Sequence, residues 1–181
     1  MVISLIGSTD KRPVIYTLMK LFQKLGDCCV VTPNPQFKRL TEDGSPYGHF
    51  QNIYVAVTNA TQDEIFAEIG FTMHDFENFI FDCDTEIPTF SDLVIYVGGA
   101  GKMTDDEELL LEMYGEYKTI NLGFGDKCIP YTVDMWKNVE MTEGLHILPP
   151  ANPQVAQRLA TFLTEPLKIP AKDIVKVVTS K

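Results

Sequence analysis

The sequence has little of several residue types that would point to a particular chemistry. Its 181 residues include one tryptophan and only three histidines, which are His49, His74 and His146. The histidines are far apart, and no Ser- or Cys-centred motif accompanies them, so the sequence predicts no catalytic triad. No stretch approaches the ~18 apolar residues that span a bilayer, and the first residues lack the basic region of a signal peptide. We therefore expect a soluble, cytoplasmic protein.

The four cysteines lack the spacing of zinc and redox motifs. Cys28 and Cys29 are adjacent, whereas Cys83 and Cys128 stand alone, so no pair has CxxC spacing. Successive residues of a strand point to opposite faces, so a bridge between Cys28 and Cys29 would need strained geometry. We expect buried, reduced thiols, as in cytosolic proteins.

Positive charge is also scarce. There are 15 Lys and Arg residues against 25 Asp and Glu, which gives a formal net charge of −10. Proteins that hold nucleic acid by attracting its phosphates have the opposite balance, so we expect no direct binding of DNA or RNA. Apolar residues make up 45% and charged residues 22%, an ordinary globular mixture. A chain of this length forms one domain by default.

Short apolar runs alternate with helical patterns along the chain. The expected strands are Val2–Gly7, Cys28–Thr32, Ile53–Thr58, Asn78–Asp82, Asp92–Val97, Thr119–Leu122 and Leu145–Leu148. The expected helices run from Pro13 to a stop at Gly26, over Ala60–Ile69, over Thr104–Tyr114 and from Asn152-Pro153 onward; Pro33–Phe50 is expected as a loop.

This alternation predicts an α/β fold with one mainly parallel, doubly wound sheet flanked by helices, a Rossmann-like three-layer sandwich. We expect one domain over residues 1–165. Residues 166–181 would form a tail, whose run Ile174–Val178 suits a strand or a short helix equally well.

Two turns at strand ends carry groups that suit an anion. The turn after the first strand holds Ser8, Thr9, Lys11 and Arg12 next to a helix N-terminus. An alternative is that Lys11 and Arg12 are ordinary exposed charges, or that they pair with Asp82 or Asp84.

The second turn, Gly98–Lys102, combines Gly98, Gly99, Gly101 and Lys102, and its small residues allow a ligand to approach the backbone closely. Its spacing is not that of a phosphate loop, because Met103 stands where Ser or Thr is required. A mobile turn is the alternative.

Two carboxylates, Asp82 and Asp84, follow a buried strand. Ligands of α/β proteins bind at the carboxyl ends of strands, and Mg²⁺ is held by one or two carboxylates with phosphate. The alternative is that Asp82 caps backbone groups and Asp84 is solvated.

The order of elements resembles the ParA/MinD type of proteins, the deviant-Walker branch of the P-loop NTPases. Val2–Thr32 is similar to the opening strand, turn, helix and strand of that family, and Phe76–Val97 is similar to its Walker B region, with Asp82 as the strand-end Asp. Leu145–Leu163 looks like the segment before its last helices. The resemblance implies a homodimer, and Mg-ATP as the ligand if nucleotide binding is retained; relatives of the MinD type often end in a membrane-binding helix.

The departure from the family is in the turn Gly7–Pro13. It has one glycine, no Gly-Lys-Ser/Thr ending, an Asp at position 10 that repels phosphate, and Pro13, which removes a first-turn N–H. We therefore expect a pseudo-ATPase with no catalytic residues and no required cofactor.

Such a protein would act through protein contacts. The family suggests a role in localising or assembling a larger machine for secretion, pilus formation, conjugation or partition. One alternative is a divergent NTPase that still binds Mg-nucleotide; another is a flavodoxin-like domain with a small ligand over Ser8–Arg12. The tail lysines, Lys168, Lys172, Lys176 and Lys181, keep membrane contact open, although the net charge opposes anionic lipid.

Overall fold

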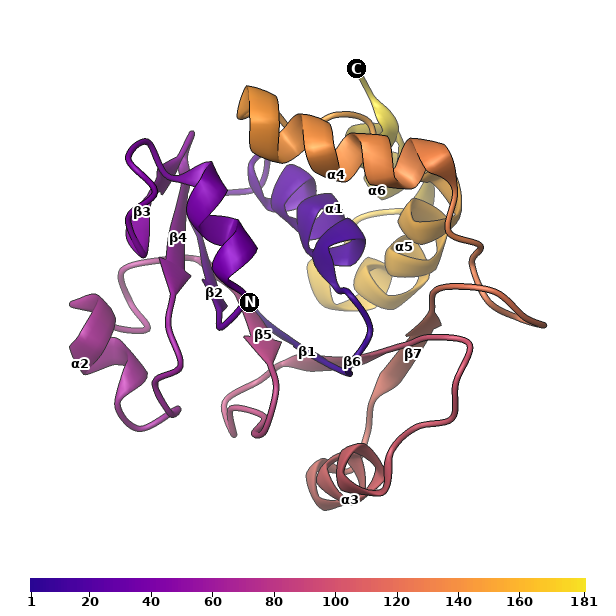
Figure 1. Cartoon of the computed structure of the whole chain (residues 1–181), viewed down its shortest axis with the longest axis horizontal. Coiled ribbons are helices and arrows are strands. Elements are labelled where there is room, and N and C mark those ends of the chain that lie inside the picture. The colour runs from indigo at the N-terminus through magenta and orange to yellow at the C-terminus, as the bar shows by residue number, and fades with distance from the viewer.

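A seven-stranded sheet in the order β3-β4-β2-β5-β1-β6-β7 runs through the middle of the computed structural model, which describes all 181 residues (Figure 1). The strands are β1 (Val2–Ile6), β2 (Cys28–Thr32), β3 (Tyr47–Phe50), β4 (Ile53–Val57), β5 (Asn78–Cys83), β6 (Leu93–Gly98) and β7 (Lys118–Asn121). Every neighbouring pair is parallel except β3 with β4. The predicted α/β class with a mainly parallel sheet is confirmed.

Helices cover both faces of the sheet. They are α1 (Arg12–Phe22), the 3₁₀ helix η1 (Pro35–Leu40), α2 (Ile65–Ile69), α3 (Asp105–Tyr114), α4 (Val133–Leu145), α5 (Pro153–Leu167) and α6 (Ala171–Thr179). The larger apolar core lies on the face covered by α1, α4, α5 and α6, and a smaller one on the face covered by α2 and α3 (Figure 1). This arrangement gives three layers. None of the helices is long and apolar enough to cross a membrane.

The central strands form because both of their faces are covered. Every residue of β1 and β5 is buried, and their runs VISLI and NFIFDC are almost continuously apolar, as strands buried on two faces are. Helix α1 has Pro13 in its first turn, as expected, and is buried along its length because α4, α5 and α6 pack against it. The β1–α1 connection is therefore held in place from several sides.

The C-terminal residues pack onto the same core. Residues 166–181 form the end of α5 and all of α6, so the run Ile174–Val178, open between strand and helix, is helical. Ile174 and Val178 are buried in the larger core beside α1.

Three sequence predictions of secondary structure were wrong. The expected strand Leu145–Leu148 is instead the end of α4 and the chain after it, where Leu145 is 63% exposed. The expected loop Pro33–Phe50 contains η1 and β3. The expected helix Ala60–Ile69 is helical only from Ile65. Helix α4 was missed because its buried face continues from Met135 and Val139 into the polar Thr142 and Glu143, so the apolar part of the pattern is too short to recognise.

Candidate functional site

The predicted site residues meet at the carboxyl edge of the sheet. Strand β1 pairs with β5 on one side and with β6 on the other. The turn after β1, Asp82 near the end of β5 and the loop Gly98–Lys102 after β6 are therefore neighbours. Ligands of open α/β sheets bind at this edge, so the candidates lie where such folds place their ligands.

Lys11 is buried in the turn and forms an ion pair. Its Nζ lies 3.0 Å from Asp82 Oδ1 and 3.9 Å from Asp84 Oδ1, and it donates a hydrogen bond to the Gly7 carbonyl oxygen at 2.5 Å. Lys11 and Asp82 are both buried, whereas Asp84 is exposed. Of the alternatives for Lys11, the structure has the ion pair, and its ammonium occupies the place that a cation between the two carboxylates would take.

Asp82 is held from a second side by Thr32 at the end of β2. The Thr32 hydroxyl donates to Asp82 Oδ2 at 2.6 Å. Asp82 Oδ1 faces the Lys11 ammonium as an ion pair without a well-aligned hydrogen bond. Removal of the Lys11 charge would leave the Asp82 carboxylate buried without a cation, whereas Lys11 would keep the more distant Asp84 if the Asp82 charge were removed.

The backbone N–H of Ser8 is bound by a carboxylate from α3. It donates to Glu107 Oε1 at 2.7 Å. The other oxygen of Glu107 accepts from the Thr104 N–H at 2.9 Å and from the Tyr96 hydroxyl at 3.3 Å. Burial opposes the charge of Glu107, but the N–H groups of Thr104 and Ser8 outweigh it and lower the pKa below 4.5. An internal anion therefore holds an N–H of the turn in which a phosphate loop would bind phosphate.

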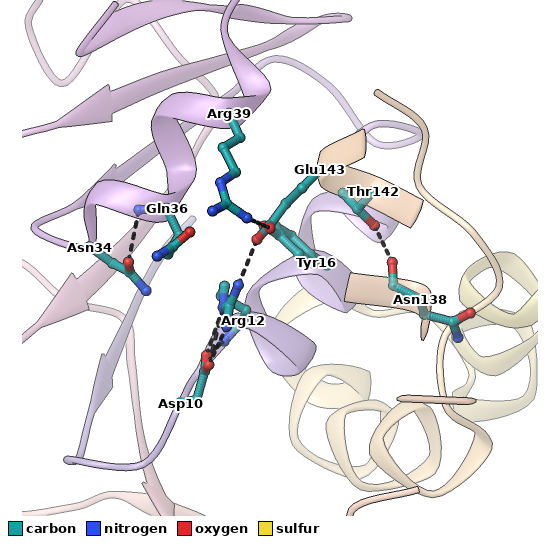
Figure 2. A network of polar contacts seen from close by, with 9 residues as sticks. All are labelled: Asp10, Arg12, Tyr16, Asn34, Gln36, Arg39, Asn138, Thr142 and Glu143. Carbon is teal, nitrogen blue, oxygen red and sulfur yellow. Dashed lines mark hydrogen bonds and ion pairs between the residues drawn. The ribbon is translucent and has the colours of Figure 1, made fainter. Parts of the chain in front are cut away.

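Arg12 lies between two further carboxylates (Figure 2). Its backbone N–H and Nη2 bond Asp10 at 3.0 and 2.7 Å, and its Nη1 lies 2.8 Å from Glu143 Oε1. Burial disfavours the guanidinium charge, but the hydrogen bonds to Asp10 and Glu143 prevail, so the pKa of Arg12 is raised. Asp10 thus pairs with Arg12 instead of facing an empty phosphate site.

Glu143 joins α4 to α1 and η1. Besides Arg12, it accepts from the Tyr16 hydroxyl at 2.8 Å and from Arg39 Nη1 at 3.3 Å (Figure 2). Burial, and then the charge of Glu143, raise the pKa of Tyr16. Sequence reasoning missed Glu143 and Arg39. Both are far from Arg12 in the chain, and helix α4, which carries Glu143, was not predicted.

The glycines at this edge allow close packing within the protein. A side chain at Gly7, which has φ +136°, would place its Cβ 2.2 Å from the Val97 carbonyl oxygen, and one at Gly99 would come within 2.8 Å of Thr9 Oγ1. The two candidate turns therefore touch each other. Gly98 likewise packs closely, against Asn121.

The remaining two candidates of the second turn make no such contacts. Gly101 has open space around it, and Lys102 is exposed and outside all the ion pairs of the structure.

A cavity of about 330 Å³ opens between the loops that follow β4 and β5. Its charged lining residues are Asp82, Asp84 and Glu86, and no Lys, Arg or His lines it. Burial raises the pKa of the lining Cys83 to about 12, so this thiol stays protonated and weakly nucleophilic at neutral pH. No group of three or more His, Cys, Asp or Glu side chains is arranged to hold a metal ion. The cavity is thus poorly suited to phosphate.

Neither a family model nor a curated protein matches this chain. The site is therefore interpreted from its own geometry, in which carboxylates of the chain hold a backbone N–H and both cations of the β1–α1 turn.

Proposed function

We propose that this protein is a non-catalytic, ParA/MinD-like pseudo-ATPase that acts by protein–protein contact in localising or assembling a larger machine. One observation carries the first part of the proposal. In the β1–α1 turn, where a P-loop protein holds phosphate, carboxylates of the chain already bind the Ser8 N–H and both cations.

The charges and hydrogen-bond donors of the turn leave little for a phosphate to bind. A phosphate site needs free N–H groups and a free cation. Here the Ser8 N–H is bound by Glu107, Lys11 is paired with Asp82, and Arg12 is paired with Asp10 and Glu143. A phosphate in this turn would displace these carboxylates and then lie next to them, with like charges in close contact.

The two ligand-binding alternatives meet the same obstacle. Mg²⁺ between Asp82 and Asp84 would have to displace the buried Lys11 ammonium. A flavin or other phosphate-bearing ligand over the turn would compete with the same internal carboxylates, and the adjacent cavity offers it no cation. Neither alternative has a specific contact in its favour.

The remaining parts of the proposal rest on the resemblance and on composition. A homodimer and service to a larger machine follow from the ParA/MinD likeness, and four free cysteines suit a reducing, cytoplasmic compartment. Sedimentation over a range of protein concentrations tests the dimer. Isolation of the tagged protein from its host, followed by identification of co-purifying proteins, tests whether it belongs to a larger assembly.

Thermal unfolding with and without Mg-ATP, Mg-GTP and FMN tests the central part. A ligand at 100 times its dissociation constant adds about 2.7 kcal/mol of stability. We expect no change in Tm with any of the three. A rise of several degrees with Mg-ATP that is lost in Asp82→Asn, and kept in the matched exposed variant Asp105→Asn, would overturn the pseudo-ATPase proposal.

A further inference from the structure

Helix α3 has an apolar stripe that faces away from the protein. The helix contacts the smaller core through Leu111, with Leu110 and Tyr114 at its margin. On its outer side, Leu109 is 58% exposed and Met113 is 78% exposed. These two residues are four positions apart and so lie one above the other on the same helix face. Figure 1 shows α3 set apart from the other helices.

Acidic residues surround this stripe. The exposed acids on and just after α3 are Asp105, Asp106, Glu108, Glu112 and Glu116. Among them only Glu116 has an ion pair, with Lys118 at 3.2 Å. The first-turn acids stabilise the helix through its dipole, but Glu112, in the last turn, does the opposite. Helix stability thus does not account for the acids near the C-terminal end of α3.

A second cavity, of about 680 Å³, adjoins that end of α3. Aromatic rings and carboxylates line it, from Tyr114, Tyr117, Phe162, Asp92, Glu116 and Glu165, and its one basic lining residue, Lys118, pairs with Glu116 and leaves Asp92 and Glu165 outside any ion pair. Aromatic faces and carboxylates both attract an ammonium or a guanidinium. Tyr114, which follows Met113 on α3, and Glu116 both line the cavity, so the cavity lies at the end of α3 that carries Met113.

We propose that this surface, the outer face of α3 with the adjoining cavity, binds a basic amphipathic helix of a partner protein. Apolar side chains of the partner would cover Leu109 and Met113, its lysines or arginines would pair with the acids, and one of them would enter the cavity. The inference names the partner class of the contact function proposed above and so rests on that function.

The charge of the surface argues for this partner over others. The same face of a second copy would bring like charges together, and anionic lipid or nucleic acid would be repelled in the same way. Helix α3 has ten residues, hence a length of about 15 Å, so a partner helix of three to four turns would cover it.

Fluorescence anisotropy with two synthetic peptides tests the proposal. The probe is a labelled amphipathic helix of about 14 residues made of Leu and Lys, roughly 21 Å long, and its control has the same composition in an order that destroys the apolar face. At about 0.15 M salt, where exposed charges are screened beyond ~8 Å, we expect the probe to bind at least tenfold more tightly than the control peptide.

Variants locate the binding. Leu109→Gln with Met113→Gln should weaken probe binding about tenfold, and Glu112→Lys should weaken it further. The matched control, Val133→Gln with Leu145→Gln, changes two residues of α4 that are 71% and 63% exposed and should leave binding unchanged. Because all these side chains are exposed, the variants should fold, and circular dichroism checks this.

Three results would overturn the proposal. They are equal binding of the two peptides, an equal loss in the α4 control, and a dimer that dissociates in Leu109→Gln with Met113→Gln, since the occupant would then be a second copy. If the two peptides bind equally and no nucleotide binds, only this inference is overturned. A Tm rise with Mg-ATP would instead sink the proposed function and leave the peptide result as a separate finding.

Discussion

Two acidic regions of the molecule use their carboxylates in opposite ways. At the β1–α1 turn, buried carboxylates bind groups of the protein itself. Glu107 accepts a hydrogen bond from the Ser8 N–H, and Asp82 forms an ion pair with Lys11. On the outer face of α3, Asp106, Glu108 and Glu112 are exposed and take part in no ion pair. In a chain with a net charge of −10, the carboxylates at the turn are therefore neutralised within the protein, whereas those on α3 are free to bind a partner.

Glu107 connects the two regions. It lies on α3, where it completes a capping box with Thr104, and its carboxylate also reaches Ser8. Its neighbour Glu108 points to solvent. The placement of α3 therefore depends on the same turn that, in our account, is closed to phosphate. Breaking the internal pairs should cost stability, whereas changing the outer acids should not.

The largest expected effect is that of Lys11→Met, which leaves the buried Asp82 carboxylate without its cation. We expect a loss of about 4 kcal/mol in the free energy of unfolding, measured by urea denaturation. Asp82→Asn in the same chain should restore part of it. The control Lys102→Met, at an exposed lysine, should change stability by less than about 0.5 kcal/mol. A similar small effect for Lys11→Met would show that the ion pair does not hold the turn.

Glu143→Gln should come next. It removes the charge that Arg12, Tyr16 and Arg39 share, and hydrogen bonds to charged groups contribute about 1.5–3 kcal/mol. We expect a loss of about 2 kcal/mol. Glu140→Gln, an exposed change on the same helix, serves as the control. Equal effects of the two substitutions would contradict a structural role for the network.

Glu107→Gln should cost about 1.5 kcal/mol at pH 7 and should depend on pH. Because folding lowers the pKa of Glu107 below 4.5, its ionisation contributes stability above that pH and loses the contribution as the pH falls through the folded pKa. The difference in Tm between wild type and variant should therefore shrink below pH 4.5. Glu108→Gln should show no such trend, and a constant difference for Glu107→Gln would argue against the bond to Ser8.

The smallest expected effect is that of Leu109→Gln with Met113→Gln on stability. Both side chains are largely exposed, so the free energy of unfolding should change by less than about 0.5 kcal/mol. A loss above 2 kcal/mol would mean that the stripe packs within the protein and is not a free surface.

The sequence predicted those strands and helices whose residue pattern is visible within a short stretch of the chain. Continuous apolar runs located β1, β2 and β5, and Thr104 with Gly115 bounded α3. Strand β3 was missed because only Phe50 of its four residues is buried, as suits the edge of a sheet.

The structure brings the predicted residues to one edge of the sheet, but most of their contacts could not be predicted. The sequence offered an ion pair between Lys11 and Asp82 as one alternative. The sequence could not show that Glu107 reaches Ser8, 99 residues away. The position of Glu107 in the first turn of a helix already explained its negative charge through the helix dipole. The position of Glu143 depends in turn on a helix whose buried face is partly polar.

The most direct measurement is an NMR titration of ¹⁵N-labelled protein with Mg-ATP, followed at the backbone amide of Ser8. The account predicts that this resonance stays in place as Mg-ATP is added, and that it moves with pH as Glu107 takes up its proton below pH 4.5. A saturable shift with Mg-ATP at Ser8, Thr9 and Gly99 would contradict the account, because it would show that nucleotide displaces the internal carboxylates from the turn.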